Sequence, residues 1–133
     1  MERLDKAIEL HHKGFNCAQA VVMAYCDMFD MDEKTAMRAA EGFGGGMGGF
    51  NSTCGALSGC VMLAGLKDSD GDTENGPKTK MTTYADSKAM VADFREFCGA
   101  VNCNEIKSGK KISCDGCIAH ACEMAEKYLL GTK

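Results

Sequence analysis

The segment GFGGGMGGFNSTCGALSG, residues 42–59, places eight glycines in eighteen positions. Each glycine in a regular helix or strand costs about 0.5–1 kcal/mol relative to alanine, because its backbone loses more freedom on folding. The run therefore predicts an irregular loop that leads into a helix near Cys54. Backbone N–H groups in such a loop can bind an anionic group. The alternative is that the glycines serve only chain flexibility and tight helix packing.

Helical signals on both sides of this loop predict an all-α fold. Apolar residues recur at helical spacing, and strand-like alternation is weak throughout the chain. We expect a single domain over residues 1–133, an irregular bundle of five to six helices. The expected helices cover about residues 1–13, 16–29, 33–41, 54–66, 77–98 and 114–130, with Cys103 in a short connector or single turn.

Local residue signals place several of these helix ends. The sequence DMDE, Asp30–Glu33, predicts a capping box for the third helix. Pro77 suits the first turn of the long helix that ends at Cys98. Ser113 predicts an N-cap for the last helix, and Gly131 marks its end.

The composition limits the classes of partner. The chain has 133 residues, 45% of them hydrophobic, and a formal net charge of −4. This acidic balance argues against nucleic acid and membrane surfaces as partners, because both favour a basic face. The start, MERLDKAIELHH, lacks the apolar region of a signal peptide, and no apolar run approaches the ~20 residues of a membrane span. We therefore expect a cytoplasmic protein.

Nine cysteines are unusual for a chain of this length. Their number is odd, and no export signal is encoded. Disulfides are rare in the reducing cytosol, where cysteines in such numbers more often bind metal or take part in redox chemistry. Free cysteine also packs as a small apolar residue, so each one has to be considered separately.

The residue before each cysteine separates them into two groups. Four cysteines follow Asn, Thr or Ser, the residue types that cap helix N-termini: these are Cys17, Cys54, Cys103 and Cys114. A thiol at the first position of a helix lies at the positive end of the helix dipole. Its pKa is lowered, and the thiolate is the form that attacks disulfides and binds metals.

The remaining cysteines follow residues that do not cap helices. Four of them are expected to pack in helix interiors: Cys26, Cys60, Cys98 and Cys122. Cys117 is ambiguous, since it lies one turn beyond Cys114 in the sequence CDGC. It could share a site with Cys114 or form a local disulfide.

The order of these features resembles a known family. The sequence Asn16–Cys17–Ala18 is followed by the loop GFGGGMGG, the hexapeptide CGALSG, Cys103 and a cysteine that opens the last helix. This pattern is similar to that of the redox-active proteins named for the signature C_GCAxxG_C_C, which have a CGAxxG motif and four characteristic cysteines. The resemblance implies redox activity and a site formed by Cys17, Cys54, Cys103 and Cys114, the same four that follow capping residues. Cys117 is the other possible match for the fourth position.

Other motifs are weak or incomplete. Gly44, Gly46 and Gly49 match GxGxxG, but no strand precedes them, so we expect no nucleotide. Cys117 is followed by Ile118 rather than histidine, so no haem attachment site is present. Ferredoxin-like cysteine spacings are absent, so any iron–sulfur cluster would have dispersed ligands. The pair His11–His12 lies in the last turn of the first helix, where we expect solvated cations.

Three hypotheses for the function follow. The first is a small electron-transfer protein that binds an iron–sulfur cluster, with an oxidoreductase or another electron-transfer protein as partner. Its metal ligands would be Cys17, Cys54, Cys103 and Cys114, and the glycines beside the cofactor would be Gly45, Gly46, Gly48 and Gly55.

The second hypothesis is a metal-free thiol–disulfide oxidoreductase or redox sensor. Here Cys54 would be the nucleophile and Cys17 a second reactive thiol, because the glycine loop gives access to Cys54. The third is a zinc-binding or purely structural module that docks on an oxidoreductase. The sequence leaves open whether the protein is an enzyme, and which oligomeric state it has.

Overall fold

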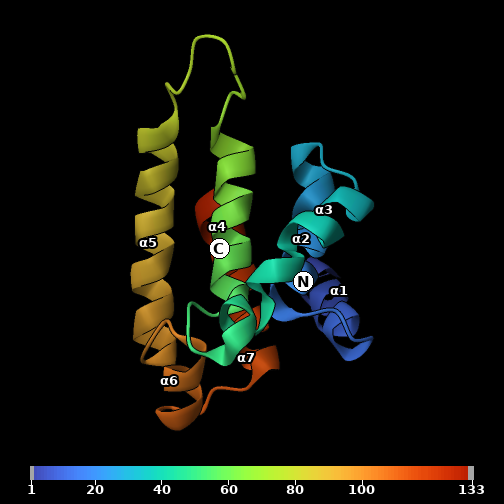
Figure 1. Ribbon diagram of the computed structural model, residues 1–133, viewed down its shortest axis with the longest axis vertical. Helices are drawn as coiled ribbons and strands as arrows, with labels where there is room; N and C mark the ends of the chain where they lie inside the picture. The colour runs from blue at the N-terminus through green and yellow to red at the C-terminus, as the bar shows by residue number, and fades with distance from the viewer. Residues whose placement is uncertain (1, 132–133) are drawn as a thin grey trace.

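Two apolar helices form the centre of the protein. The computed structural model describes residues 2–131. In it, α2 (Cys17–Tyr25) packs against α4 (Gly55–Asp68) (Figure 1). Both sequences are apolar around most of their circumference, and all nine residues of α2 are buried. A helix that is apolar on every side belongs in the core, which explains this central placement.

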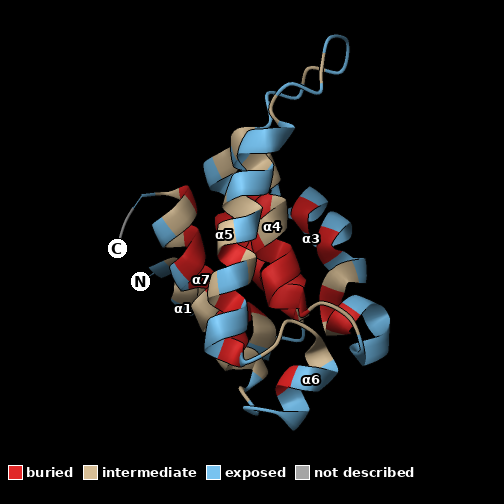
Figure 2. Ribbon diagram, turned by 90° about the vertical axis from the view of Figure 1, so that its left-hand side faces the viewer, coloured by how far each residue is buried: buried red, intermediate tan, exposed pale blue. Residues whose placement is uncertain are grey.

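The other helices surround this pair. α1 (Glu2–His12) and α3 (Glu33–Ala40) pack against α2, and α5 (Lys80–Cys98) packs against α4. α7 (Cys114–Met124) contacts α1, α2, α4 and α5, and so brings the two ends of the chain together. The outer helices are amphipathic, and Figure 2 shows exposed residues along the outer face of α5. The buried residues of α5 recur every fourth position: Met90, Phe94 and Cys98.

The structure confirms the expected all-α class. Residues 2–131 form seven α-helices and no strand, and a single isolated bridge joins Thr53 to Asn102. The seventh helix arises because the expected connector at Cys103 forms a short helix, α6 (Cys103–Ser108). Shorter helical turns extend or link these helices, at Cys26–Phe29, Glu41–Phe43, Gly46–Phe50 and Ala125–Leu129. Within the described residues, no helix combines the length and apolar character needed to cross a bilayer.

The N-cap of α3 and the start of α5 differ from the predictions. The cap of α3 is Asp32, whose side chain accepts a hydrogen bond from the Thr35 amide at 3.0 Å. Asp30 instead adopts a left-handed conformation and ends the preceding turn, so the capping box predicted at Asp30–Glu33 is wrong. α5 begins at Lys80, three residues after Pro77, because the polar loop continues further than the proline suggested.

Small residues let α4 approach α2 very closely. A Cβ atom at Gly59 would lie 3.1 Å from the carbonyl oxygen of Ala18, and one at Gly55 would lie 3.1 Å from the Ala18 amide nitrogen. Any larger side chain at these positions would separate the two helices. The small residues of CGALSG therefore accommodate the backbone of α2, and this places the starts of α2 and α4 beside each other.

Candidate functional site

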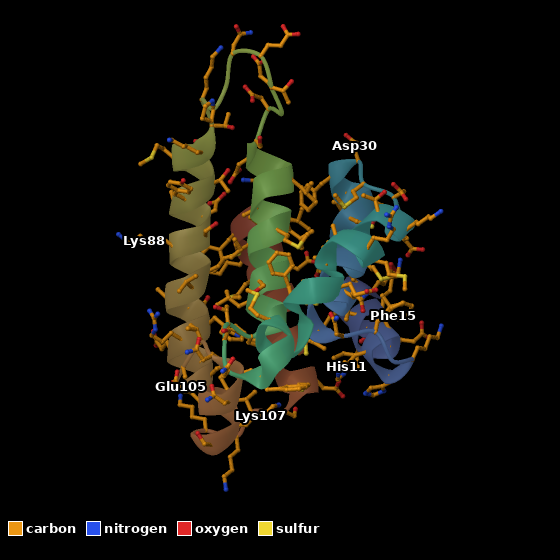
Figure 3. All side chains as sticks on the ribbon, in the orientation of Figure 1. His11, Phe15, Asp30, Lys88, Glu105 and Lys107 are labelled. Carbon is orange, nitrogen blue, oxygen red and sulfur yellow. The ribbon has the colours of Figure 1, made fainter. Side chains whose placement is uncertain are left out.

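The four cysteines that follow capping residues all line one pocket. Its volume is about 500 Å³, and its wall includes Cys17, Cys54, Cys103 and Cys114 together with Cys117. The pocket lies where the starts of α2, α4, α6 and α7 meet. Figure 3 shows Lys107, another lining residue, at this end of the bundle. The structure therefore brings together five thiols from four separate segments of the chain.

A capping box fixes the start of α2 and with it Cys17. The Asn16 side chain accepts a hydrogen bond from the Gln19 amide at 2.9 Å, and the Gln19 side chain accepts one from the Asn16 amide at 3.0 Å. The Asn16 side chain also donates to the Glu41 carbonyl at 2.9 Å, which joins α2 to the segment that enters the glycine loop. These bonds satisfy amides at the helix start and hold Cys17 as the first helical residue.

A short antiparallel pairing holds Cys54 beside Cys103. The Cys54 amide donates to the Val101 carbonyl at 2.7 Å, and the Cys103 amide donates to the Ser52 carbonyl at 2.8 Å. Cys54 is the N-cap of α4 rather than its first residue, one position earlier in the helix than expected, because Gly55 is the first residue with helical geometry. Cys103 is the first residue of α6, as the preceding Asn102 predicted.

The glycine loop packs directly against Cys103. Gly46 has a φ of +57°, and a Cβ atom there would lie 2.7 Å from the Cys103 Cβ and 2.9 Å from the Ser52 carbonyl oxygen. Only glycine fits this position without moving Cys103. Of the four glycines predicted beside a cofactor, Gly45, Gly46 and Gly55 line the pocket. Gly48 does not: it is exposed on the outer side of the loop, so its assignment to the site is corrected.

The start of α7 supplies two thiols to the pocket. The Ser113 side chain accepts a hydrogen bond from the Gly116 amide at 3.0 Å, so that α7 begins at Cys114 as predicted. Cys117 lies one turn further along and reaches the same pocket. Cys114 is partly exposed, whereas Cys117 is buried. The geometry places both residues at the site, and the choice between them as the fourth ligand stays a prediction.

Cys114 is the most acidic thiol of the group. The Cys17 thiol donates a hydrogen bond to Cys114, and the Lys107 ammonium donates another across 3.1 Å. These contacts outweigh burial and lower the pKa of Cys114 to about 5. The same hydrogen bond, together with burial, raises the pKa of Cys17. The negative charge at this end of the pocket therefore belongs to Cys114, with Cys17 as its proton-bearing partner.

A second group of thiols extends from the pocket into the core. Cys54 donates a hydrogen bond to Cys117, and this bond and burial raise the pKa of Cys54. The bond from Cys54 lowers the pKa of Cys117, but contact with Cys98 and burial raise it to a net value of about 12. The Sγ atoms of Cys98 and Cys117 lie 3.9 Å apart. In the metal-free protein the structure thus favours Cys114, and not Cys54, as the reactive thiolate.

The cysteines predicted to pack in the core are buried. They are Cys26, Cys60, Cys98 and Cys122, each at most 1% exposed. The Cys60 thiol donates to the Ala121 carbonyl at 2.9 Å, which links α4 to α7. None of the four lines the pocket, although Cys98 contacts the pocket residue Cys117.

Sequence reasoning missed three side chains at or beside the pocket. Lys107 lies one turn after Cys103 on α6, a spacing that could have indicated it. Phe50, in the glycine loop, lines the pocket opening and is 65% exposed. His11 was expected in solvent, but its Nδ1 atom lies 2.7 Å from the carboxylate of Asp115, and it is within 4.8 Å of the Cys17 and Cys114 sulfur atoms. No local signal connects His11 to Asp115, because 104 residues separate them.

Comparisons with known proteins identify the family of this chain. A protein of Archaeoglobus fulgidus described as "Uncharacterized protein" is 31% identical over 116 residues, which cover 80% of this chain and 77% of the relative. No solved structure matches the chain significantly. The model of one family, described as "Putative redox-active protein (C_GCAxxG_C_C)", matches residues 15–128, a span that includes all five pocket cysteines. The chain therefore belongs to the C_GCAxxG_C_C family of redox-active proteins.

Proposed function

We propose that this protein transfers electrons through an iron–sulfur cluster held by Cys17, Cys54, Cys103 and Cys114. The observation that carries the proposal is that these four cysteines, dispersed over most of the chain, line one pocket. Iron–sulfur clusters are held by cysteine thiolates, commonly four of them. The cluster would take up and release an electron reversibly, and the surrounding residues would set its reduction potential.

The size and shape of the pocket fit such a group. A volume of about 500 Å³ falls within the ~300–1,000 Å³ range of cofactor and ligand pockets. Gly46 keeps the loop close to Cys103, and a side chain there would enter the space beside that thiol. The wall also carries the apolar side chains of Phe50 and Ile106, which limit the access of water. The exposure of a bound cluster to solvent is one of the factors that set its reduction potential.

The charges around the pocket favour an anionic group. The helices α2, α4 and α7 begin at the pocket. The N-terminal end of each helix carries a partial positive charge. Lys107 adds a full positive charge beside Cys114. Thiols must lose their protons to bind metal, so the hydrogen bonds between Cys17 and Cys114 and between Cys54 and Cys117 would be replaced on binding.

The position of the pocket suits electron exchange with another protein. Cys103 and Cys114 are partly exposed, so the pocket reaches the molecular surface on that side. Phe50 and Lys107 lie at the same opening and offer an apolar and a cationic contact. We propose an oxidoreductase or another electron-transfer protein as the partner, docked over this opening.

Analysis of anaerobically purified protein tests the proposal. We expect a brown protein with iron and acid-labile sulfide in comparable amounts, and a broad visible absorption that bleaches on reduction. A colourless protein that contains neither iron nor sulfide would contradict the proposal. Tightly bound zinc held by the pocket cysteines, without redox cycling, would favour instead the structural module that the sequence left open.

A metal-free thiol–disulfide oxidoreductase is the second candidate, and the paired thiols favour it. Cys114 would attack one sulfur of a substrate disulfide, forming a mixed disulfide and releasing one substrate thiol. Cys17, its hydrogen-bonded neighbour, would then attack Cys114, form the Cys17–Cys114 disulfide and release the second thiol. Two electrons would pass from the protein to the substrate.

Mass spectrometry of the metal-free protein separates this candidate from the first. After reaction with glutathione disulfide under non-reducing conditions, the second candidate predicts one internal disulfide between Cys17 and Cys114. Stable glutathione adducts on scattered cysteines, without an internal disulfide, would contradict it.

A further inference from the structure

A cluster of three metal-binding side chains lies on the surface next to the thiol pocket. His11 and His12 end α1, and Asp115 is the second residue of α7. The His11 Nδ1 atom lies 2.7 Å from one oxygen of Asp115, and the His12 Nε2 atom lies 2.6 Å from the other. One potential ligand atom from each of the three residues lies within 4.8 Å of the other two.

The donor set is one that transition metals favour. Imidazole suits zinc, copper, iron and nickel, and two histidines with one carboxylate form a common set for a divalent ion. Bonds of about 2.0–2.2 Å to these atoms require only small side-chain movements from the observed spacing. Because His12 is 63% exposed, solvent can complete the coordination shell.

A second set of ligand atoms shares His11 with this cluster. His11, Cys17 and Cys114 also lie within 4.8 Å of one another, but both sulfur atoms belong to the pocket. His12 and Asp115 do not line that pocket. A metal at the histidine–aspartate cluster can therefore bind while all five pocket thiols remain in use elsewhere.

We propose that His11, His12 and Asp115 form a second metal site, which binds a late first-row divalent cation such as Zn²⁺. The ion would join the last turn of α1 to the first turn of α7, two segments about a hundred residues apart in the chain. It would replace two surface hydrogen bonds with coordination bonds next to Cys114. The site is independent of the iron–sulfur proposal, since it uses none of the cysteines.

Metal binding to the purified protein, with its native cofactor content, tests the site. Equilibrium dialysis against Zn²⁺ measures the affinity, and the melting temperature is recorded with and without the ion. We expect one bound Zn²⁺ and a rise in melting temperature, because a ligand that binds only the folded state stabilises it. His12→Ala and Asp115→Asn should weaken binding by more than about 100-fold, the upper end of the loss from changes outside the coordination shell.

A control variant and a spectroscopic probe identify the donors. Glu123→Gln removes an exposed carboxylate from α7, the helix that also carries Asp115. Glu123 contacts His120 and not the proposed site, so this variant should leave the Zn²⁺ affinity unchanged. Replacing Zn²⁺ by Co²⁺ should give weak visible d–d bands in the difference spectrum, without an intense sulfur-to-cobalt charge-transfer band.

Three results would overturn the site. These are the absence of Zn²⁺ binding, an affinity unchanged in His12→Ala, or a charge-transfer band that assigns the metal to the thiols. Because His12 is on the surface, its alanine variant should fold, which circular dichroism checks. Iron and sulfide contents measured on the same samples keep this result separate from the iron–sulfur proposal.

Discussion

The Nζ atom of Lys107 lies 3.1 Å from the Sγ atom of Cys114. Lys107 is the one cationic side chain among the described residues that line the pocket. It comes from α6 and meets a thiol at the start of α7, so the short helix that the sequence predicted only as a connector or single turn supplies the positive charge of the site.

Replacing this lysine should make Cys114 a weaker acid. Together with the hydrogen bond from Cys17, the ammonium lowers the pKa of Cys114 to about 5. In metal-free Lys107→Met protein the thiolate loses this support and its pKa rises. A rise of about one pKa unit should slow alkylation by iodoacetamide about fivefold at pH 5, close to the wild-type pKa. Lys107→Arg keeps the charge and should react nearly as fast as the wild type. An identical pH profile in Lys107→Met would show that the lysine does not stabilise the thiolate.

Serine replacements should separate ligands from core cysteines. Cys17→Ser, Cys54→Ser, Cys103→Ser and Cys114→Ser should each lose most of the iron bound after anaerobic purification, since serine is a poor ligand for iron–sulfur clusters. Cys60→Ser is the matched control, because a serine hydroxyl can also donate to the Ala121 carbonyl. Cys26→Ser should likewise keep the iron, at a cost of about 1–3 kcal/mol if its hydroxyl stays unpaired.

Cys117→Ser decides between the two candidates for the fourth position. Retention of iron in this variant and loss in Cys114→Ser would assign the position to Cys114. The opposite result would assign it to Cys117. Equal loss of iron in the pocket variants and in the two core variants would contradict the division of the cysteines into two groups.

The glycine loop offers a test with a closely matched control. An alanine at Gly46 or Gly48 must adopt a left-handed backbone, which costs about 1–2 kcal/mol. At Gly46 the new Cβ atom would also collide with Cys103, whereas at Gly48 nothing lies within 4 Å. We therefore expect Gly46→Ala to lose iron and Gly48→Ala to keep it, with similar far-ultraviolet circular dichroism. If both variants keep their iron and lose only thermal stability, the loop has a structural role alone.

A carboxylate remote from the pocket predicts part of the acid sensitivity of the fold. Asp93 on α5 accepts hydrogen bonds from Tyr128 at 2.8 Å and from His120 at 2.9 Å. Burial raises the pKa of Asp93, but these two contacts outweigh it and leave the pKa below its usual value. The folded state therefore gains stability from this group above the unfolded pKa of about 3.9, and loses it as the pH falls through the folded value.

Chemical denaturation at several pH values measures this contribution. Asp93→Asn should lower the free energy of unfolding by about 1–2 kcal/mol at pH 6, and the difference from the wild type should shrink below about pH 4. Tyr128→Phe removes one hydrogen bond and keeps the charge of Asp93, so the decrease in the free energy of unfolding should be smaller. A difference that stays constant down to pH 2 would contradict the assignment.

Local sequence signals were sufficient for most helix starts at the site. The residues Asn16, Asn102 and Ser113 indicated the positions of Cys17, Cys103 and Cys114, because an N-cap depends on residues within one turn. The same reasoning failed at α3, where DMDE contains two aspartates of equal capping ability. The chain used the second of them, Asp32.

Contacts between distant segments were beyond sequence reasoning. The pairing of Thr53 with Asn102 depends on two loops that meet only in the folded chain. The greater acidity of Cys114 than of Cys54 has the same origin. Cys17 and then Lys107 lower the pKa of Cys114, Cys117 raises that of Cys54, and in each case the neighbour comes from another helix. Position at a helix start alone predicts a lowered pKa for both thiols. Burial and hydrogen bonds to other helices make their pKa values different.

The cysteines that line the pocket lie far apart in the sequence, and this has a consequence for biosynthesis. A ribosome-bound chain that has emerged only as far as α5 contains Cys17 and Cys54, but neither Cys103 nor Cys114. The pairing of residues 52–54 with residues 101–103 cannot form at that stage, and α1 cannot yet pack against α7. The complete set of pocket thiols therefore exists only after α7 has been synthesised. Any cofactor that needs all of them can be inserted only once this helix has emerged.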